Sequence, residues 1–217
     1  MYRWLTAAGL RVAAAAKRVV DRLAGFVAVA LLRLVRRIEP ERAGRFAERV
    51  MRRIGPWRPE HRIGRANLAA AFPEKPPQEI ERILSDVWGN LGWTVAEYAH
   101  LDRLWDYRLG DPTPGRVEID AASLERGIRL AQDGKPALTF AAHTGNWELP
   151  AVAAAAHGIE TAVLYRTPSV SDVAQAVNAI RRINMGTLVP SSPQAVFILM
   201  RALEQGKHVG MLVDQYF

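Results

Sequence analysis

Residues Pro136-Ala-Leu-Thr-Phe-Ala-Ala-His-Thr-Gly-Asn-Trp-Glu-Leu-Pro150 join a short apolar run to a turn and then to an alanine-rich run. The apolar residues from Ala137 to Ala141 predict a short buried strand, and the run from Trp147 to Gly158 predicts a helix. A strand, a glycine turn and a helix in this order are typical of α/β folds. In such folds, ligands bind outside the carboxyl ends of the strands.

Two residues of this segment have side chains suited to proton transfer. His143 lies at the end of the predicted strand, and Glu148 lies in the first turn of the predicted helix. Their spacing lets the carboxylate reach the imidazole, so Glu148 would orient a neutral His143 that removes a proton from an alcohol. Gly145 permits a tight turn, and the amides at the helix start favour an oxyanion. The spacing alone favours a structural histidine beside a glutamate that complements the helix dipole. The position of the pair at a predicted strand–turn–helix junction makes the two interpretations equally good.

The longer string His143-Thr-Gly-Asn-Trp-Glu148, preceded by an apolar strand, closely resembles the signature of the lipid A biosynthesis lauroyl/myristoyl acyltransferase family. These are bacterial inner-membrane enzymes of the wider glycerolipid acyltransferase group. Other stretches resemble the same family in the expected order: Glu60-His-Arg-Ile-Gly-Arg-Ala-Asn-Leu-Ala-Ala-Ala-Phe-Pro73, Asn90-Leu-Gly-Trp-Thr-Val-Ala-Glu97, Leu164-Tyr-Arg166 and Gly206-Lys-His-Val-Gly-Met-Leu-Val-Asp-Gln215. The resemblance extends from about residue 58 to the end of the chain.

The resemblance implies an O-acyltransferase that moves a fatty acyl group from acyl carrier protein, or from a coenzyme A thioester, to a lipid A precursor. The acceptor would be a hydroxyl of a 3-hydroxyacyl chain. His143 would act as the general base and Glu148 would orient it. The candidate substrate-binding residues are Gly145, Asn146, Trp147, Arg166, Arg182, Asp214 and Gln215. The implied location is the cytoplasmic face of the bacterial inner membrane.

Several of these candidates also follow from their positions in the predicted elements. Arg166 follows a strand end, as His143 does, and an arginine there can bind a phosphate with two hydrogen bonds. Arg181 and Arg182 lie on the next helix and are weaker candidates, because a solvated helix face explains them equally well. Asp214-Gln215 lies at another strand end and could position the His143–Glu148 pair, bind substrate or hold a turn.

Composition limits the chemistry that the chain can perform. It has 217 residues, which is long enough for a real core, and no cysteine, so it has no disulfide and no thiolate metal site. The sequence contains no glycine-rich phosphate loop and no His/Asp/Glu metal cluster, so we expect no metal or nucleotide cofactor. The absence of cysteine and of a Gly-x-Ser-x-Gly elbow agrees with direct transfer that needs no acyl-enzyme.

Positive charge is concentrated near the N-terminus. Residues 1–62 hold 15 of the 29 lysines and arginines but only 5 of the 22 acidic residues. The uncharged run from Leu23 to Leu32 lies between two basic clusters and is shorter than the about 20 apolar residues of a membrane span. We therefore expect a basic helix lying on anionic lipid rather than binding nucleic acid. A signal peptide and a soluble helix packed on the domain are the alternatives. The same charge would attract an acidic carrier protein.

A second basic feature is a stripe of arginines on a helix predicted from about residue 41 to 53. Its members recur at three- and four-residue spacing, which indicates either a solvated face or contact with lipid headgroups. They are Arg42, Arg45, Arg49, Arg52 and Arg53. The pattern stays helical through residue 109, and Gly89 and Gly92 could break or bend a helix that begins near Pro77.

The remaining chain alternates strands and helices. We predict strands at 116–120, 161–165, 187–189 and 208–213, and helices at 121–132, 171–184 and 193–204. This order indicates a mostly parallel sheet with helices on both faces. The expected organisation is a basic helical membrane-associating segment at 1–57 and an acyltransferase α/β domain at 58–217. Within that domain, 58–110 is a helical lead-in and 111–217 is the α/β core.

The resemblance also implies that family members continue beyond Phe217, so we expect that a C-terminal portion is missing from this chain. Two alternatives to a lipid A acyltransferase remain open. One is an enzyme of the same fold that acylates another glycolipid or phospholipid. The other is an inactive, truncated membrane-bound remnant, against which the intact His143 and Glu148 pair argues.

Overall fold

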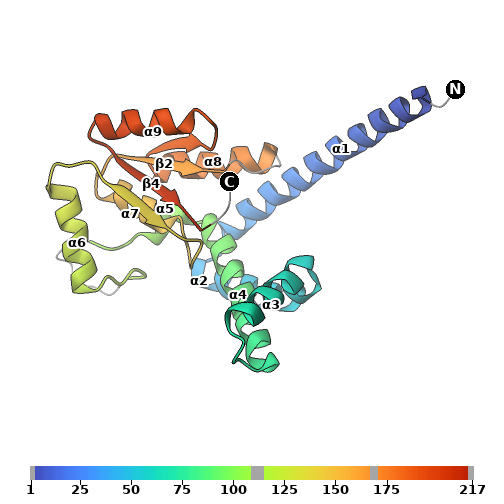
Figure 1. The fold of residues 1–217 in the computed structure, drawn as a ribbon, viewed down its shortest axis with the longest axis horizontal. Helices are drawn as coiled ribbons and strands as arrows, with labels where there is room; N and C mark the ends of the chain where they lie inside the picture. The colour runs from blue at the N-terminus through green and yellow to red at the C-terminus, as the bar shows by residue number, and fades with distance from the viewer. Residues whose placement is uncertain (1–2, 109–114, 167–170, 215–217) are drawn as a thin grey trace.

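The structure is a computed structural model that describes residues 3–108, 115–166 and 171–214. The N-terminal half is helical, and the C-terminal half alternates helices with strands (Figure 1). The elements are α1 (Arg3–Val35), α2 (Pro40–Ile54), the 3-10 helix η1 (Gly55–Trp57), α3 (Pro59–Ala71), α4 (Pro77–Tyr98), α5 (Leu101–Leu104), α6 (Ala121–Gln132), β1 (Leu138–Ala141), α7 (Leu149–Ala156), β2 (Thr161–Tyr165), α8 (Ser171–Asn184), β3 (Thr187–Pro190), α9 (Ala195–Glu204) and β4 (His208–Leu212).

The four described strands form one parallel sheet in the order β1-β4-β2-β3. The last strand in sequence, β4, therefore lies in the middle of the sheet, where Val209 faces Leu138 of β1 on one side and Ala162 of β2 on the other. Helices cover the sheet, which confirms the α/β class with a parallel sheet and a helical N-terminal segment. Because the strands are parallel, all four carboxyl ends lie at one edge.

Each face of the sheet has its own apolar core. Helix α9 packs on one face, where Ala162, Val189 and Val209 lie against Ala195, Leu199 and Ala202. On the other face, α5, α7 and α8 share a core that contains Leu101, Leu104, Val152 and Met185. Helix α6 has no buried residue and lies over this second face, where it leaves an apolar cavity between itself, α7 and the sheet.

Helices α2 and α4 pack so closely that glycines are needed between them. A Cβ atom on Gly44 would lie 2.1 Å from the Trp93 ring, and one on Gly92 would lie 2.6 Å from the Ala47 carbonyl oxygen. The prediction that Gly89 and Gly92 could interrupt the helix is wrong, since α4 runs unbroken from Pro77 to Tyr98. These glycines instead permit close approach of α2.

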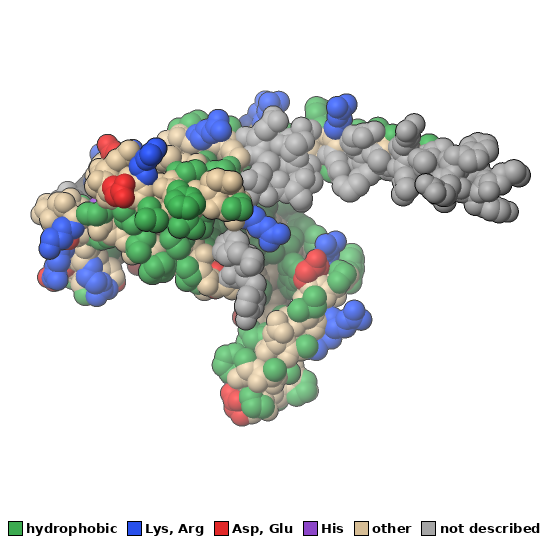
Figure 2. Space-filling view, turned by 45° about the horizontal axis from the view of Figure 1, so that its top comes forward, with side chains coloured by type: hydrophobic (Ala, Val, Ile, Leu, Met, Phe, Trp, Pro, Cys, Tyr) green, Lys and Arg blue, Asp and Glu red, His purple; other side chains and the backbone are tan. Residues whose placement is uncertain are grey.

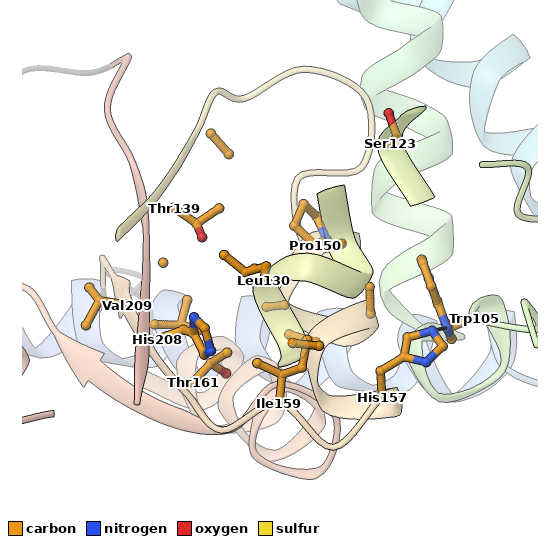
Figure 3. Close-up of a pocket in the computed structure, with 18 of the residues that line it drawn as sticks. Trp105, Ser123, Leu130, Thr139, Pro150, His157, Ile159, Thr161, His208 and Val209 are labelled. Carbon is orange, nitrogen blue, oxygen red and sulfur yellow. Dashed lines mark hydrogen bonds between the residues drawn. The ribbon is translucent and has the colours of Figure 1, made fainter. Parts of the chain in front are cut away.

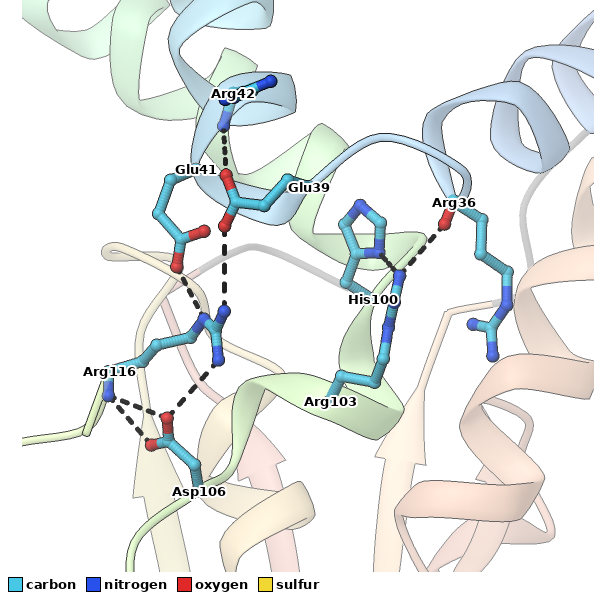
Figure 4. Close-up of polar contacts among 8 residues, drawn as sticks. All are labelled: Arg36, Glu39, Glu41, Arg42, His100, Arg103, Asp106 and Arg116. Atoms are coloured by element: carbon cyan, nitrogen blue, oxygen red, sulfur yellow. Dashed lines mark hydrogen bonds and ion pairs between the residues drawn. The ribbon is translucent and has the colours of Figure 1, made fainter. Parts of the chain in front are cut away.

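An ionic cluster at the junction of α1 and α2, which we call the elbow network, joins the helical segment to the α/β core (Figure 4). Arg116 bonds Glu41 at 2.6 Å and also pairs with Glu39 and Asp106. Arg36 pairs with Asp102 at 2.8 Å, and Arg103 donates to the Arg36 carbonyl. The network therefore ties the end of α1 and the start of α2 to α5 and to the segment before α6.

The predicted strand at 116–120 is wrong. The carboxylate of Asp106 accepts hydrogen bonds from the backbone N–H groups of Arg116 and Val117, and Asp120 accepts one from the N–H of Ser123 as the N-cap of α6. The Asp106 side chain thus takes two backbone donors that a strand ladder could have used, and Asp120 starts helix α6 at the end of the segment. Alternating residues alone do not make a strand without a neighbouring edge with which to pair.

Exposed apolar residues on α1 recur at three- and four-residue spacing, as on a helix with one apolar face. They include Val19, Val20, Leu23, Phe26, Val27, Leu31 and Leu34. Among the described residues, no helix combines the length and the apolar character that crossing a bilayer requires. Apolar side chains also gather on the side of the molecule that carries α9 (Figure 2), where Phe197 of α9 is exposed.

Candidate active site

The turn after β1 and the end of β4 bring His143 and Asp214 together. Because β1 and β4 are neighbours in the sheet, their carboxyl ends lie side by side. The backbone N–H of His143 donates to Asp214 Oδ2 at 2.8 Å, and the imidazole Nδ1 lies 2.8 Å from Asp214 Oδ1. These two hydrogen bonds from His143 hold the pKa of the Asp214 carboxyl below its usual value. Asp214 is therefore an anion that orients the ring.

Glu148 lies at the start of α7 in a different environment, because only 3% of the residue is exposed. Its carboxylate accepts hydrogen bonds from the Tyr98 hydroxyl and from the Arg181 guanidinium, whose Nε lies 3.1 Å from Oε2. The guanidinium also lies over the rings of Tyr98 and Tyr165. We call Tyr98, Glu148 and Arg181 the buried triad.

Within the buried triad, hydrogen bonds and opposite charges offset the cost of burying the three polar side chains. Burial alone would lower the pKa of Arg181, but the hydrogen bonds and negative charge of Glu148 raise it above its usual value. Burial, together with the Glu148 charge, raises the pKa of the Tyr98 hydroxyl, so that the phenol keeps its proton and donates it. A buried carboxylate that is paired and hydrogen-bonded in this way is fixed in place.

The predicted contact between Glu148 and His143 is therefore not made. Both oxygens of Glu148 are taken by the other members of the buried triad, while the Nδ1 atom of His143 is taken by Asp214. The reason is that spacing along the chain fixes only how far a carboxylate can reach. The direction in which it points is set here by α4 and α8, which supply a hydroxyl and a cation from distant parts of the sequence.

The turn between His143 and Glu148 is held by its own contacts. Gly145 has φ +55°, a left-handed conformation that suits glycine, and its carbonyl accepts a hydrogen bond from the Thr94 hydroxyl. The side-chain amide of Asn146 donates to Glu97 at 2.8 Å, and its oxygen accepts the N–H of Glu148. Burial raises the pKa of Glu97. Asn146 is thus engaged in holding the turn.

Trp147 lies against the general-base candidate. Its ring centroid is 5.0 Å from that of His143, at an angle of 59°. The backbone N–H groups of Gly145, Asn146 and Trp147 have no hydrogen-bond acceptor among the described residues. These three donors are unpaired within the described residues, in the turn that directly follows His143.

The other predicted residues fall in different places. Arg166 is exposed after β2 and lines a small pocket of about 130 Å³ together with His143, Glu148 and Arg181. Arg182 is exposed and does not line this pocket. Gln215 lies outside the described residues. Arg181 and Arg182 were both weaker candidates, and only Arg182 was included among the predicted substrate-binding residues. Of the two, Arg181 is the arginine that lies in the site.

A larger apolar cavity of about 440 Å³ adjoins this pocket (Figure 3). Helices α6 and α7 and the sheet form its walls, with Leu130 and Pro150 on the helices and Thr139, Thr161 and His208 on the strands. Trp147, Val163 and Leu212 line both spaces. Its volume falls within the about 300–1,000 Å³ of small-molecule sites. An apolar chain in this cavity could place a polar end beside His143.

The arrangement has the chemistry that a general base acting on a hydroxyl would need. The hydrogen bond to the Asp214 carboxylate requires a proton on Nδ1 of His143, which leaves Nε2 as the basic nitrogen. Nε2 makes no hydrogen bond to a described residue. Within the described parts of the chain, no group of three or more His, Asp or Glu side chains is arranged to hold a metal ion.

A family model supplies the class of enzyme. Residues 14–217 match the model of the bacterial lipid A biosynthesis acyltransferases. This chain belongs to that family and is therefore an acyltransferase of the kind that acts in lipid A biosynthesis. A search of curated proteins found no match.

Proposed function

We propose that the chain transfers a fatty acyl group from acyl carrier protein, or from a coenzyme A thioester, to a hydroxyl of a lipid A precursor. The reaction would take place at the cytoplasmic face of the bacterial inner membrane. The observation that carries the proposal is the oriented His143. Its Nε2 is unpaired among the described residues, and the residue lines a pocket that adjoins the apolar cavity. Family membership supplies the acyl-transfer chemistry.

In the proposed reaction, Nε2 of His143 removes the proton of the acceptor hydroxyl. The resulting alkoxide oxygen attacks the thioester carbonyl carbon and forms a tetrahedral oxyanion. The C–S bond then breaks, and the leaving thiolate takes the proton back from the imidazolium. The products are an ester and a free thiol, and no covalent acyl-enzyme forms. Asp214 stabilises the imidazolium while it exists.

The turn and the buried triad hold the other groups of this reaction. The free N–H groups of Gly145, Asn146 and Trp147 would donate to the oxyanion. Glu148 would act through the backbone, because its ion pair with Arg181 anchors the helix that follows these donors. We thus assign the direct orientation of His143 to Asp214 and the positioning of the turn to Glu148.

We assign the apolar cavity to the acyl chain and Arg166 to a phosphate of the acceptor. Gly127 of α6 lines the cavity, and a Cβ atom built on it meets no atom within 4 Å. A larger side chain there would project into open space within the cavity. Gly127→Phe should therefore reduce transfer of long chains more than transfer of short ones. Ala122→Phe, which lies on the same helix at an exposed position outside the cavity lining, is the matched control.

The test of the reaction is an acyl-transfer assay with purified membranes, labelled acyl carrier protein and a lipid A precursor. His143→Ala should lower transfer by about 10²–10⁴-fold while the circular dichroism melt is unchanged. His143→Gln, which keeps a donor for Asp214 but no base, should be equally inactive. Normal transfer by either folded variant would overturn the assignment of the base. Label that moves into another glycolipid or phospholipid would keep the chemistry and change the acceptor.

A further inference from the structure

The side of α2 that faces away from α4 combines arginines with large apolar side chains. We call this surface the outward face of α2. Phe46 is 67% exposed, and Trp57, just beyond the helix, is 78% exposed. The members of the face are Arg42, Arg45, Phe46, Arg49, Val50, Arg53, Ile54 and Trp57.

The four arginines of this face have no partner for their guanidinium groups among the described residues. Arg52, the fifth arginine of the predicted stripe, differs from them, because it faces α4. It donates to Glu48 at 3.0 Å and to Asp86 at 2.7 Å. Arg52 thus serves the contact between helices. The other four form no close ion pair with a described residue and place positive charge on the surface, although Arg45 and Arg49 also interact at longer range with Glu41 and Glu48.

The opposite side of α2 is locked against α4 and cannot turn outward. Gly44 lies under the ring of Trp93, and the Trp93 indole N–H donates to Glu48 at 2.8 Å. The backbone at Ala47 lies directly against Gly92. The exposure of Phe46 and Trp57 is therefore a fixed property of the fold and does not depend on rotation of the helix.

The elbow network holds α2 in a set orientation to the α/β core (Figure 4). Arg116 pairs with Glu39 and Glu41 at the start of α2, and Asp106 fixes Arg116 through its backbone and side chain. A partner bound to the outward face of α2 would for this reason also hold the active site in a set orientation.

We propose that the outward face of α2 docks on a membrane surface that carries anionic phospholipid headgroups. Arginine guanidinium groups match phosphate geometry, and aromatic side chains favour the boundary between headgroups and acyl chains. The chemistry continues from the preceding helix, since α1 also exposes apolar residues beside basic ones. Phe46 and Trp57 stand out from a convex helix surface, which suits entry into a lipid layer better than closure around a protein side chain.

This inference names a partner of the proposed enzyme and rests on that function for its biological meaning. The test of the inference does not depend on the proposed function, because binding to vesicles is measured without turnover. A chain that docks but fails to transfer acyl groups would contradict only the proposed reaction. A chain that transfers acyl groups but does not dock through α2 would contradict only this inference.

The first experiment uses the full chain, which contains no cysteine, so that single cysteines can be labelled. A polarity-sensitive fluorophore is attached to Phe46→Cys, to Trp57→Cys and, as a control, to Ala122→Cys on exposed α6. Vesicles of phosphatidylglycerol and phosphatidylcholine should shift the emission to shorter wavelength at the first two positions but not at the third. Vesicle binding without a shift at positions 46 and 57 would show that α1 binds alone and would overturn the proposal.

The second experiment tests whether vesicle binding depends on the arginines of the outward face of α2 or only on the net charge of the chain. Arg42→Gln/Arg49→Gln should weaken partitioning into phosphatidylglycerol vesicles by about 25-fold, at about fivefold for each arginine. The matched variant Arg126→Gln/Arg201→Gln removes the same charge from exposed positions on α6 and α9 and should change partitioning little. Equal losses of vesicle binding in both double variants would overturn the proposal.

Two other results would overturn the proposal by assigning the outward face of α2 to another partner. If Arg42→Gln/Arg49→Gln binds vesicles normally but binds acyl carrier protein more weakly, the face binds an acidic protein. If the fluorophore at position 46 or 57 shifts its emission without lipid, and the shift grows with protein concentration, the face binds a second copy of the chain.

Discussion

Two acidic side chains reach the neighbourhood of His143 from regions with opposite properties. Glu148 is 3% exposed and lies among α4, α7 and α8, where a tyrosine and an arginine take both of its oxygens. The Asp214 side chain is 37% exposed at the end of β4 and contacts the imidazole directly. A buried, fully paired carboxylate holds its surroundings in place, whereas a partly solvated one can respond to a ring whose charge changes. The two carboxylates therefore have different roles.

The largest expected effect concerns stability in the buried region. Arg181→Met leaves the Glu148 carboxylate buried without its cation, which should lower the free energy of unfolding by about 3–5 kcal/mol. Arg182→Met, one residue away and exposed, should change it by less than about 0.5 kcal/mol. Urea denaturation of both variants gives the comparison. Similar stability of the two variants would mean that the buried triad does not hold the fold.

The next effect concerns activity in the exposed region. Asp214→Asn keeps the size of the side chain but removes the anion that stabilises the imidazolium, and it should lower the acyl-transfer rate by about 10²-fold. Stability should change little compared with Arg181→Met, because Asp214 is partly solvated. Steady-state assays beside a thermal melt measure both quantities. Full activity in a folded Asp214→Asn protein would return the orienting role to Glu148.

A smaller effect should follow from Tyr98→Phe. This change removes one hydrogen bond to the charged Glu148 but leaves its ion pair with Arg181 intact, and should cost about 1.5–2 kcal/mol of stability. Tyr107→Phe, outside the buried triad, is the control. A cost as large as that of Arg181→Met would show that the hydroxyl, not the cation, stabilises the buried carboxylate.

The smallest effect is a dependence of stability on pH. The pKa of Asp214 is lower in the folded chain than its unfolded value of about 3.9. The stability that this group contributes is therefore fully present above that value and is lost as the pH falls through the folded pKa. The difference in unfolding free energy between the wild type and Asp214→Asn should shrink as the pH is lowered below about 4. A difference that stays constant would show that the Asp214 contacts do not favour its anion.

Local patterns in the sequence were sufficient to predict most elements. Helix α6 and strand β2 match their predicted ranges, because apolar periodicity and flanking turn residues are properties of neighbouring positions. The order of the strands was not predictable in this way, since pairing joins distant segments. The contact between His143 and Asp214 depends on that order, because it requires β1 and β4 to be adjacent.

The site shows the same limit at the level of single residues. Arg181 and Arg182 are neighbours in sequence, but a rotation of about 100° around α8 directs one inward and the other to solvent. The helical spacing of apolar residues indicated which arginine points inward. Arg181 lies one turn after the apolar Val177, whereas Arg182 lies one turn after the polar Asn178. Tyr98 and Glu97 were not predicted, since only packing of α4 on the turn gives them partners there.

The most direct test of the division between the two carboxylates is ¹⁵N NMR of the His143 imidazole. The signal can be assigned among the five histidines by its loss in His143→Gln. We predict a proton on Nδ1 in the wild type and in Glu148→Gln, and a loss of this preference in Asp214→Asn. A tautomer that changes in Glu148→Gln but persists in Asp214→Asn would contradict this division of roles.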